Sequence, residues 1–296
     1  MQTVGMENTG SYGAKLARHI RASQISVVEV ARPDRRASRA AGKSDPIDAY
    51  AAATAVLSCR SNGTPKDRDG TVEAIRTLRV VRASAIKPRP QTINQLKSLI
   101  MTAPAATREA LRSLTTTEVI RRLAASRPGS DLTTPATAVK LALKRLAKRY
   151  KHLSEEIADA DIELRTLITH TAPGLLALRG VGTETAGQLL VTAGNNPDRL
   201  VSEASFAHLC AAAPVPASSG RTDGHRLNRG GDRQANRALH IIVLVRTRHD
   251  PRTRDYVARR TPEGLKTKDL FRCLKRFVVR EVYHHLTGAP STSPAA

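Results

Sequence analysis

The sequence predicts a short α/β segment followed by a chain that is otherwise helical. Two β-branched runs, Thr3–Met6 and Ser26–Ala31, flank a helical stretch at Ser11–Ala22, and this order implies a parallel pair of strands with a right-handed crossover. A heptad repeat in the middle of the chain predicts one long helix. Aromatic residues make up only 3% of the 296 residues, so the cores must be built from Ala, Leu, Val and Ile, which favours helices.

The rest of the amino-terminal part is expected to be helical. One helix begins at Asp45 and runs to about Leu57. Three more helices, separated by the prolines at 88, 90 and 104, are expected at residues 71–85, 91–100 and 107–125. We assign residues 1–128 to a first domain and interpret Pro128–Pro135 as a linker.

The long helix is predicted within residues 136–172, where apolar side chains recur in alternating steps of four and three. The seam consists of Val139, Leu143, Leu146, Tyr150, Leu153, Ile157, Ala160, Leu164 and Leu167. Charged residues flank the seam on both sides, so we interpret residues 139–167 as a coiled coil through which copies of the chain form a homo-oligomer. The alternative is one helix whose seam packs within its own domain.

Residues 173–286 are predicted to form a compact helical domain, and residues 287–296, rich in Pro and Ser, a disordered tail. Two apolar helical stretches meet at Gly180-Val181-Gly182 in a helix-hairpin-helix-like element. Gly180 and Gly182 could expose backbone N–H groups at a helix N-terminus and bind phosphate. A plain tight turn accounts for the two glycines equally well.

Positive charge dominates the chain, which has 48 Lys and Arg against 26 Asp and Glu and a net charge of +22. This excess indicates a nucleic-acid partner, because binding releases the counterions of the phosphates. Arg221–Arg280, with 17 Lys or Arg and 6 Asp or Glu, has a net charge of +11 and is the expected binding stretch. The arginines expected to contact nucleic acid are Arg221, Arg226, Arg229, Arg233 and Arg237.

A membrane partner is not expected, because no apolar run reaches the roughly 18 residues of a membrane span. Cys59, Cys210 and Cys273 are far apart and show no metal-binding spacing. They are expected to be reduced thiols of a cytoplasmic, nucleoid-associated protein.

Three carboxylates form a candidate metal site. Glu7 follows the first predicted strand, at the carboxyl end where active sites of open α/β sheets gather, and Asp45 and Asp48 share one helix face. Such oxygen ligands suit Mg²⁺. The alternative is helix capping, with Asp45 as the N-cap, Pro46 at N1 and Asp48 at N3.

A second candidate site is the segment Ser218-Ser219-Gly220-Arg221. Either serine could attack a phosphate while a neighbouring arginine stabilises the developing charge. The alternative is an ordinary turn, because Ser-Ser-Gly triplets most often form turns.

Three segments together carry a resemblance to one family. Residues 7–13 (Glu-Asn-Thr-Gly-Ser-Tyr-Gly) are similar to its Glu-x-Thr-Gly-x-Tyr-Gly block, and residues 43–49 (Lys-Ser-Asp-Pro-Ile-Asp-Ala) to its Lys-Thr/Ser-Asp-x-x-Asp-Ala block. Gly180–Leu239, with Ser-Gly and Arg-Gly-Gly-Asp-Arg, and Glu263–His284 resemble its carboxy-terminal domain. The family is that of the DEDD insertion-sequence transposases, relatives of the Piv DNA invertase, whose characterised members are guided by a bridge RNA.

The resemblance implies a RuvC-like domain of the RNase H fold, a coiled-coil linker and a helical transposase domain with a catalytic serine. Glu7, Asp45 and Asp48 match the second, third and fourth carboxylates of a set that binds Mg²⁺. Ser219, directly before Gly220, matches the nucleophile that forms a phosphoserine link to DNA, with Ser218 the close competitor. DNA, a guide RNA and further copies of the chain are the implied partners.

One departure from the family concerns its first acidic residue, which lies on a strand upstream of the glutamate. Glu7 stands almost at the start of this sequence, so we expect a weakened metal site, an exposed strand edge and an impaired transposase. One alternative is a DNA- or RNA-binding remnant of a transposase without catalysis. The other is a Holliday-junction-type nuclease that uses only the carboxylates.

Overall fold

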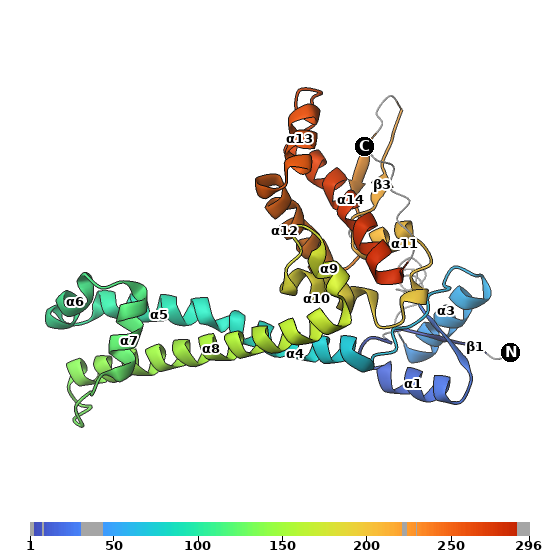
Figure 1. The fold of residues 1–296 in the computed structure, drawn as a ribbon. Coiled ribbons are helices and arrows are strands. Elements are labelled where there is room, and N and C mark those ends of the chain that lie inside the picture. Colours follow the sequence, from blue (N-terminus) through green and yellow to red (C-terminus); the bar gives the residue numbers. More distant parts are fainter. Residues whose placement is uncertain (1–2, 8, 31–43, 221–223, 229, 289–296) are drawn as a thin grey trace. The chain divides into compact units, whose positions relative to one another are not determined.

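A computed structural model describes residues 3–7, 9–30, 44–220, 224–228 and 230–288 (Figure 1). It divides into two compact units: unit 1 comprises Met1–Arg76 and Ile168–Ala296, and unit 2 comprises Thr77–Leu167. Residues 77–128 thus group with the long helix and not, as predicted from the sequence, with the amino-terminal segment. None of the helices in the described ranges has both the length and the apolar character needed to cross a membrane.

A two-stranded parallel sheet begins unit 1. β1 (Thr3–Met6) pairs with β2 (Ser26–Glu29), and α1 (Ala14–Ala22) connects them, which confirms the predicted strand–helix–strand order. α3 (Asp45–Leu57) packs on β1. This approach requires Gly5, because a Cβ there would lie 2.8 Å from Val56 Cγ2 and 2.9 Å from the carbonyl oxygen of Ala52.

Unit 2 is built entirely of helices in its described part. Its elements are α4 (Gly70–Ile86), which enters from unit 1, α5 (Pro88–Thr102), α6 (Ala105–Arg112), α7 (Thr116–Ala125) and α8 (Pro135–Thr171). Pro88 and Pro90 begin α5 rather than preceding it, because the first turn of a helix needs no intrahelical N–H. The prediction of one helix over 107–125 is wrong, since Thr115 starts a new one. Its hydroxyl accepts from the N–H of Glu118, whose carboxylate accepts from the N–H of Thr115.

The predicted long helix is confirmed by α8, and its apolar seam packs inside unit 2. Leu143 lies in one cluster with Leu96 of α5 and Leu123 of α7, while Leu153 packs against Ala85 of α4. α8 accordingly runs beside α4 and α5 (Figure 1). The alternative interpretation of the seam, packing within its own domain, therefore describes these contacts. Association of copies through residues 139–167 stays a prediction.

The carboxy-terminal part of unit 1 is a helical core with one β-hairpin. Its helices are α9 (Pro173–Ala177), α10 (Thr183–Ala193), the 3₁₀ turn η1 (Pro197–Arg199), α11 (Glu203–Leu209), α12 (Arg233–His249), α13 (Pro251–Arg260) and α14 (Thr267–Thr287). β3 (Pro214–Pro216) and β4 (His225–Leu227) pair antiparallel. α12 packs on α10, α13 and α14, with Leu189, Leu239 and Val279 fully buried. The tail predicted at 287–296 lies outside the described residues from 289 onward.

Candidate functional site

Two of the three predicted metal ligands come close enough to interact. Glu7 follows β1, and burial raises the pKa of its carboxyl, with the negative charge of Asp48 as the smaller cause. Oε1 of Glu7 is buried and has no hydrogen-bond partner among the described residues. A carboxylate with one buried oxygen that has no donor, beside a second carboxylate, is an arrangement that a cation stabilises.

Asp45 does not complete a three-carboxylate cluster. It lies exposed in the first turn of α3, and within the described ranges no group of three or more His, Cys, Asp or Glu side chains is close enough to hold a metal ion. The capping interpretation does not describe the helix start either. Ser44 is the N-cap, Asp45 already belongs to the helix, and the Ser44 side chain makes no capping hydrogen bond.

The Glu-x-Thr-Gly block has a structural role that the sequence analysis missed. The buried hydroxyl of Thr9 donates to Oε1 of Glu29 at 2.5 Å, so it ties the loop after β1 to the end of β2. The other oxygen of Glu29 accepts from Arg199 of η1 at 3.4 Å. This Thr9–Glu29–Arg199 network joins the α/β segment to the helical part of unit 1. The network consists of residues that are distant in sequence, so no local sequence pattern predicts it.

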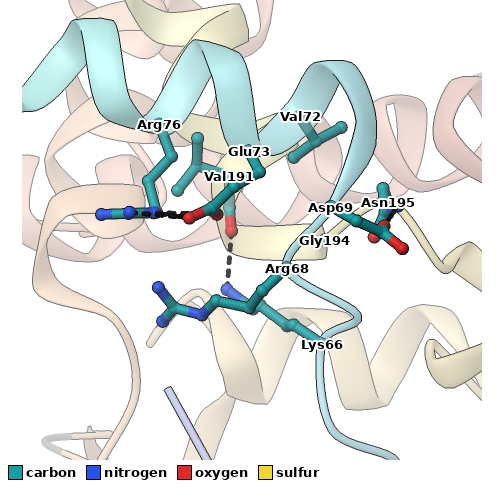
Figure 2. A pocket seen from close by; sticks show the side chains of 9 residues that line it. All are labelled: Lys66, Arg68, Asp69, Val72, Glu73, Arg76, Val191, Gly194 and Asn195. Carbon is teal, nitrogen blue, oxygen red and sulfur yellow. Dashed lines mark hydrogen bonds and ion pairs between the residues drawn. The ribbon is translucent and has the colours of Figure 1, made fainter. Parts of the chain in front are cut away.

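A second connection within unit 1 runs through Lys66, whose Nζ donates to the carbonyl oxygen of Val191 at 2.6 Å (Figure 2). Val191 lies in the last turn of α10, where a cation complements the helix dipole. Burial is the main cause that lowers the pKa of Lys66 to about 8, and the charged groups facing it are Arg199, Asp232, Arg68 and Glu29. The adjacent pocket holds only about 40 Å³, which is room for water rather than for a substrate.

The two candidate nucleophiles lie in the loop between β3 and β4. Ser218 and Ser219 are both exposed, and Gly220 adopts a left-handed backbone with φ of +56°. The Ser218 hydroxyl accepts from the N–H of Gly224 at 3.3 Å, so it takes part in closing the loop. Among the described residues no hydrogen bond joins either serine to Glu7 or Asp48.

The Arg-Gly-Gly-Asp-Arg segment contains two architectural residues at its centre. A Cβ on Gly231 would lie 2.5 Å from both the nitrogen of Ala211 and the carbonyl oxygen of His208, so only glycine permits this approach. Asp232 is the N-cap of α12 and accepts from the N–H groups of Gln234 and Ala235. Its second oxygen accepts from the buried hydroxyl of Thr192 in α10 at 2.7 Å.

Three of the five predicted nucleic-acid-binding arginines can be placed. Arg226 is exposed on β4, and Arg233 and Arg237 are exposed one turn apart on α12, where both can reach one phosphate backbone. Arg221 and Arg229 lie outside the described residues.

Gly180 and Gly182 lie in the turn between α9 and α10. Gly180 has a φ of +78° and packs on α12, since a Cβ there would lie 3.2 Å from the carbonyl oxygen of Ile242. The N–H of Gly182 donates to the Thr185 hydroxyl at 3.0 Å, and Glu184 adds negative charge to the first turn of α10. These contacts give both glycines a role in the turn, and phosphate binding by them stays a prediction.

A second basic region, in unit 2, was missed by the sequence analysis. Residues 77–151 carry 16 Lys or Arg and 3 Asp or Glu, a net charge of +13. Its densest part is the first half of α8, outside the packed seam, where the exposed basic residues are Lys140, Arg145, Lys148, Arg149 and Lys151. A charge count over every window of the sequence would have found it.

Comparison with known proteins relates both ends of the chain to transposases. Residues 1–103 match a family described as Transposase, DEDD_Tnp_IS110, and residues 172–258 match the Transposase IS116/IS110/IS902 family. A 42 kDa protein of insertion element IS900 from Mycobacterium paratuberculosis is 31% identical over 176 residues, which cover 57% of this chain and 43% of that protein. A 43.6 kDa protein of insertion element IS110 from Streptomyces coelicolor is 35% identical over 94 residues, which cover 31% of this chain and 23% of that protein. The matches thus span less than half the length of either relative.

Proposed function

We propose that this chain, whose two ends match family models of insertion-sequence transposases, is such a transposase, binds DNA and catalyses strand exchange in transposition. The observation that carries the proposal is the proximity of Glu7 and Asp48, with one buried carboxylate oxygen left without a partner. We assign the α/β segment to a RuvC-like domain on the same grounds. A guide RNA and further copies of the chain, associating through residues 139–167, are the proposed partners.

The proposed cofactor is Mg²⁺, held by Glu7 and Asp48, with Asp45 one turn earlier on α3 and outside the pair. Mg²⁺ in proteins is usually bound by one or two carboxylates together with water and substrate phosphate, so the two converging carboxylates suffice for a site that DNA completes. When bound, the ion would neutralise charge that develops on a phosphate oxygen. The chain's own contribution is to hold the two carboxylates close together and partly away from water.

The proposed nucleophile is Ser219. Its Oγ forms a new bond to phosphorus while one P–O bond of the DNA backbone breaks, and the hydroxyl proton ends on the departing sugar oxygen. The phosphoester count is unchanged, so the sugar oxygen of another strand can reverse the step and complete the exchange. Exposure of Ser219 in the β3–β4 loop supports access to DNA, and Arg226 on β4, opposite Val215, adds positive charge to the same hairpin.

Two basic regions support DNA binding: the α12 residues Arg233 and Arg237 in unit 1, and the first half of α8 in unit 2. Each phosphate contact contributes about one unit to the slope of log K against log salt concentration. A Lys148→Ala, Arg149→Ala variant of the full chain should therefore lower the slope by about two. An unchanged slope would remove α8 from the proposed surface.

Metal binding can be tested separately from catalysis by the increase in melting temperature that Mg²⁺ produces. We expect an increase for the wild type and none for Glu7→Gln or Asp48→Asn, because ligand binding stabilises only the folded state. Glu109→Gln, an exposed glutamate of unit 2, is the control that should behave as wild type. Equal increases in all four proteins would refute the site.

A second candidate function is nucleic-acid binding without catalysis. It is favoured by the absence, among the described residues, of any hydrogen bond between the serine loop and the carboxylates. Under this alternative, Ser219→Ala leaves both DNA binding and any DNA rearrangement unchanged. Loss of rearrangement with retained binding would instead support the transposase.

A further inference from the structure

A large cavity in unit 1 has no role in the site described above. It measures about 790 Å³ and opens between α12, α13 and α14, beside the turn that follows α9. Ligand sites for small organic molecules have volumes of roughly 300–1,000 Å³, so the cavity has room for a nucleotide.

The floor of the cavity is apolar and aromatic. Val243, Leu274 and Val278 are buried there, and the rings of Tyr256 and Phe277 meet edge to face with centroids 5.6 Å apart. Phe277 is nonetheless 43% exposed, an unusual state for an aromatic side chain in a concave site. Exposed aromatic surface in a cavity of this size suits a flat ring of a ligand.

The rim of the cavity carries more arginines than acids: Arg179, Arg246, Arg252, Arg259 and Arg280 line it with Asp250, Asp255 and Glu281. Two of its acids are engaged inside the protein, because Glu281 pairs with Arg246 at 2.7 Å and Asp250 accepts from Thr253. Arg252, Arg259 and the third acid, Asp255, form no ion pair among the described residues, and the Arg259 guanidinium lies over the Tyr256 ring, 5.9 Å from its centroid. Arg252 and Arg259 are seven positions apart on α13, so they lie on the same helix face as Tyr256, and both line the cavity.

One residue that lines the cavity also carries a buried polar atom without a partner. Nδ1 of His284, one of the lining residues, is buried and has no hydrogen bond among the described residues. The aromatic floor and the excess of arginines at the rim suit a ligand with a flat ring and a negative charge.

We propose that this cavity binds an unpaired nucleotide of a nucleic-acid strand, with its base against Phe277 and Tyr256 and its phosphate at Arg252 and Arg259. Bases inside a duplex are stacked on one another and cannot reach a cavity, whereas unpaired bases stack on aromatic side chains. The inference rests on the proposed function, in which the chain handles nucleic acid, and adds a site that distinguishes unpaired strands from duplex.

The test uses the full chain and fluorescein-labelled oligonucleotides of about 12 nucleotides, a length in the range of single-strand binding sites. Fluorescence anisotropy compares single strands of deoxythymidine, single strands of uridine and a DNA duplex. Phe277→Leu keeps an apolar side chain and removes the ring. It should weaken binding of single strands by about ten-fold or more, with little effect on the duplex. Preference for the uridine or the deoxythymidine strand decides between an RNA and a DNA ligand.

Charge is tested with matched double variants. Arg252→Ala with Arg259→Ala removes two arginines that line the cavity, and Arg254→Ala with Lys268→Ala removes two exposed cations that do not. The first pair should weaken single-strand binding several-fold more than the second, although both change the net charge equally. A single strand with 2-aminopurine as its only purine should lose its fluorescence quenching in Phe277→Leu if the base stacks on the ring.

The outcomes separate the two proposals. Equal binding of single strands by wild type and Phe277→Leu, or equal losses for single strand and duplex, would overturn the cavity site and leave the proposed function standing. Binding of neither single strands nor duplex by the wild type would refute the proposed function and this inference with it. If the cavity binds a protein segment instead, Phe277→Leu should bind single strands as the wild type does.

Discussion

Asp232→Ala tests whether the Arg-Gly-Gly-Asp-Arg segment is architectural at its centre, as its contacts indicate. The substitution removes the N-cap of α12, where one carboxylate oxygen accepts from the N–H groups of Gln234 and Ala235 at 2.8 and 3.2 Å. The other oxygen accepts from Thr192, whose side chain is buried. We expect a loss of stability rather than a specific loss of nucleic-acid binding.

The size of this loss follows from the same contacts. Removal of an N-cap costs about 0.5–2 kcal/mol. The Thr192 hydroxyl can turn to the carbonyl oxygen of Gln188, 2.9 Å away, so losing its bond to Asp232 adds only about 1 kcal/mol. Asp232 also favours the charged form of the buried Lys66, which makes the loss larger. The expected decrease in the free energy of unfolding is about 2–3 kcal/mol.

Urea denaturation followed by circular dichroism measures this decrease. Asp232→Asn should retain most of the stability, because Asn is also a good N-cap. Arg233→Ala, at the next position and exposed, should change stability by less than about 0.5 kcal/mol and weaken DNA binding instead. A loss below about 0.5 kcal/mol in Asp232→Ala would refute the architectural role.

Four substitutions test three other features of the structure. Glu7→Gln should raise the free energy of unfolding at pH 7 without metal by up to about 1 kcal/mol, since it removes a poorly solvated charge facing Asp48; a melting temperature below that of the wild type would contradict this. The pKa of Lys66 is about 8 in the folded chain and 10.5 ordinarily, so between these pH values the unfolded chain binds more protons than the folded chain. The free energy of unfolding should therefore rise with pH from about 8 to 10.5. A difference between wild type and Lys66→Met that stays flat from pH 8 to 10 in chemical denaturation would contradict the burial of the amine. Gly231→Ala should cost about 2 kcal/mol or more, because its Cβ meets backbone, whereas Gly182→Ala, with nothing within 4 Å, should change stability by less than about 1 kcal/mol. Equal effects of the two glycine variants on thermal unfolding would refute the close packing at Gly231.

Local patterns predicted most elements of the fold. The β-branched runs at Thr3–Met6 and Ser26–Glu29 and the seam of α8 have periods that report secondary structure directly. The break before α7 was missed because a Thr115–Glu118 capping box inside an apolar helical pattern resembles ordinary helix sequence. The partner of the seam could not be predicted, since a heptad repeat is the same whether it packs on another chain or on α4 and α5.

The candidate site was predictable only where its residues are close in sequence. The Glu7 block and Asp48 could be singled out as acids, but their proximity depends on Gly5 bringing α3 onto β1. The Thr9–Glu29–Arg199 network and the bond from Lys66 to α10 join residues that are 20 to 170 positions apart. The same reason kept the cavity between α12, α13 and α14 from being anticipated, because its lining is assembled from separate helices.

The most direct test of the central claim is a search for the covalent link between the chain and DNA. The purified chain is incubated with Mg²⁺, the RNA copurified with it and DNA carrying the ends of its insertion element, then denatured and resolved by electrophoresis. We predict a protein–DNA species whose linked residue is Ser219 by mass spectrometry, which forms with wild type and Ser218→Ala and is absent with Ser219→Ala and Glu7→Gln. An undiminished species with Ser219→Ala, or none with the wild type although the DNA is bound, would contradict the assignment of this chain as a serine-dependent transposase.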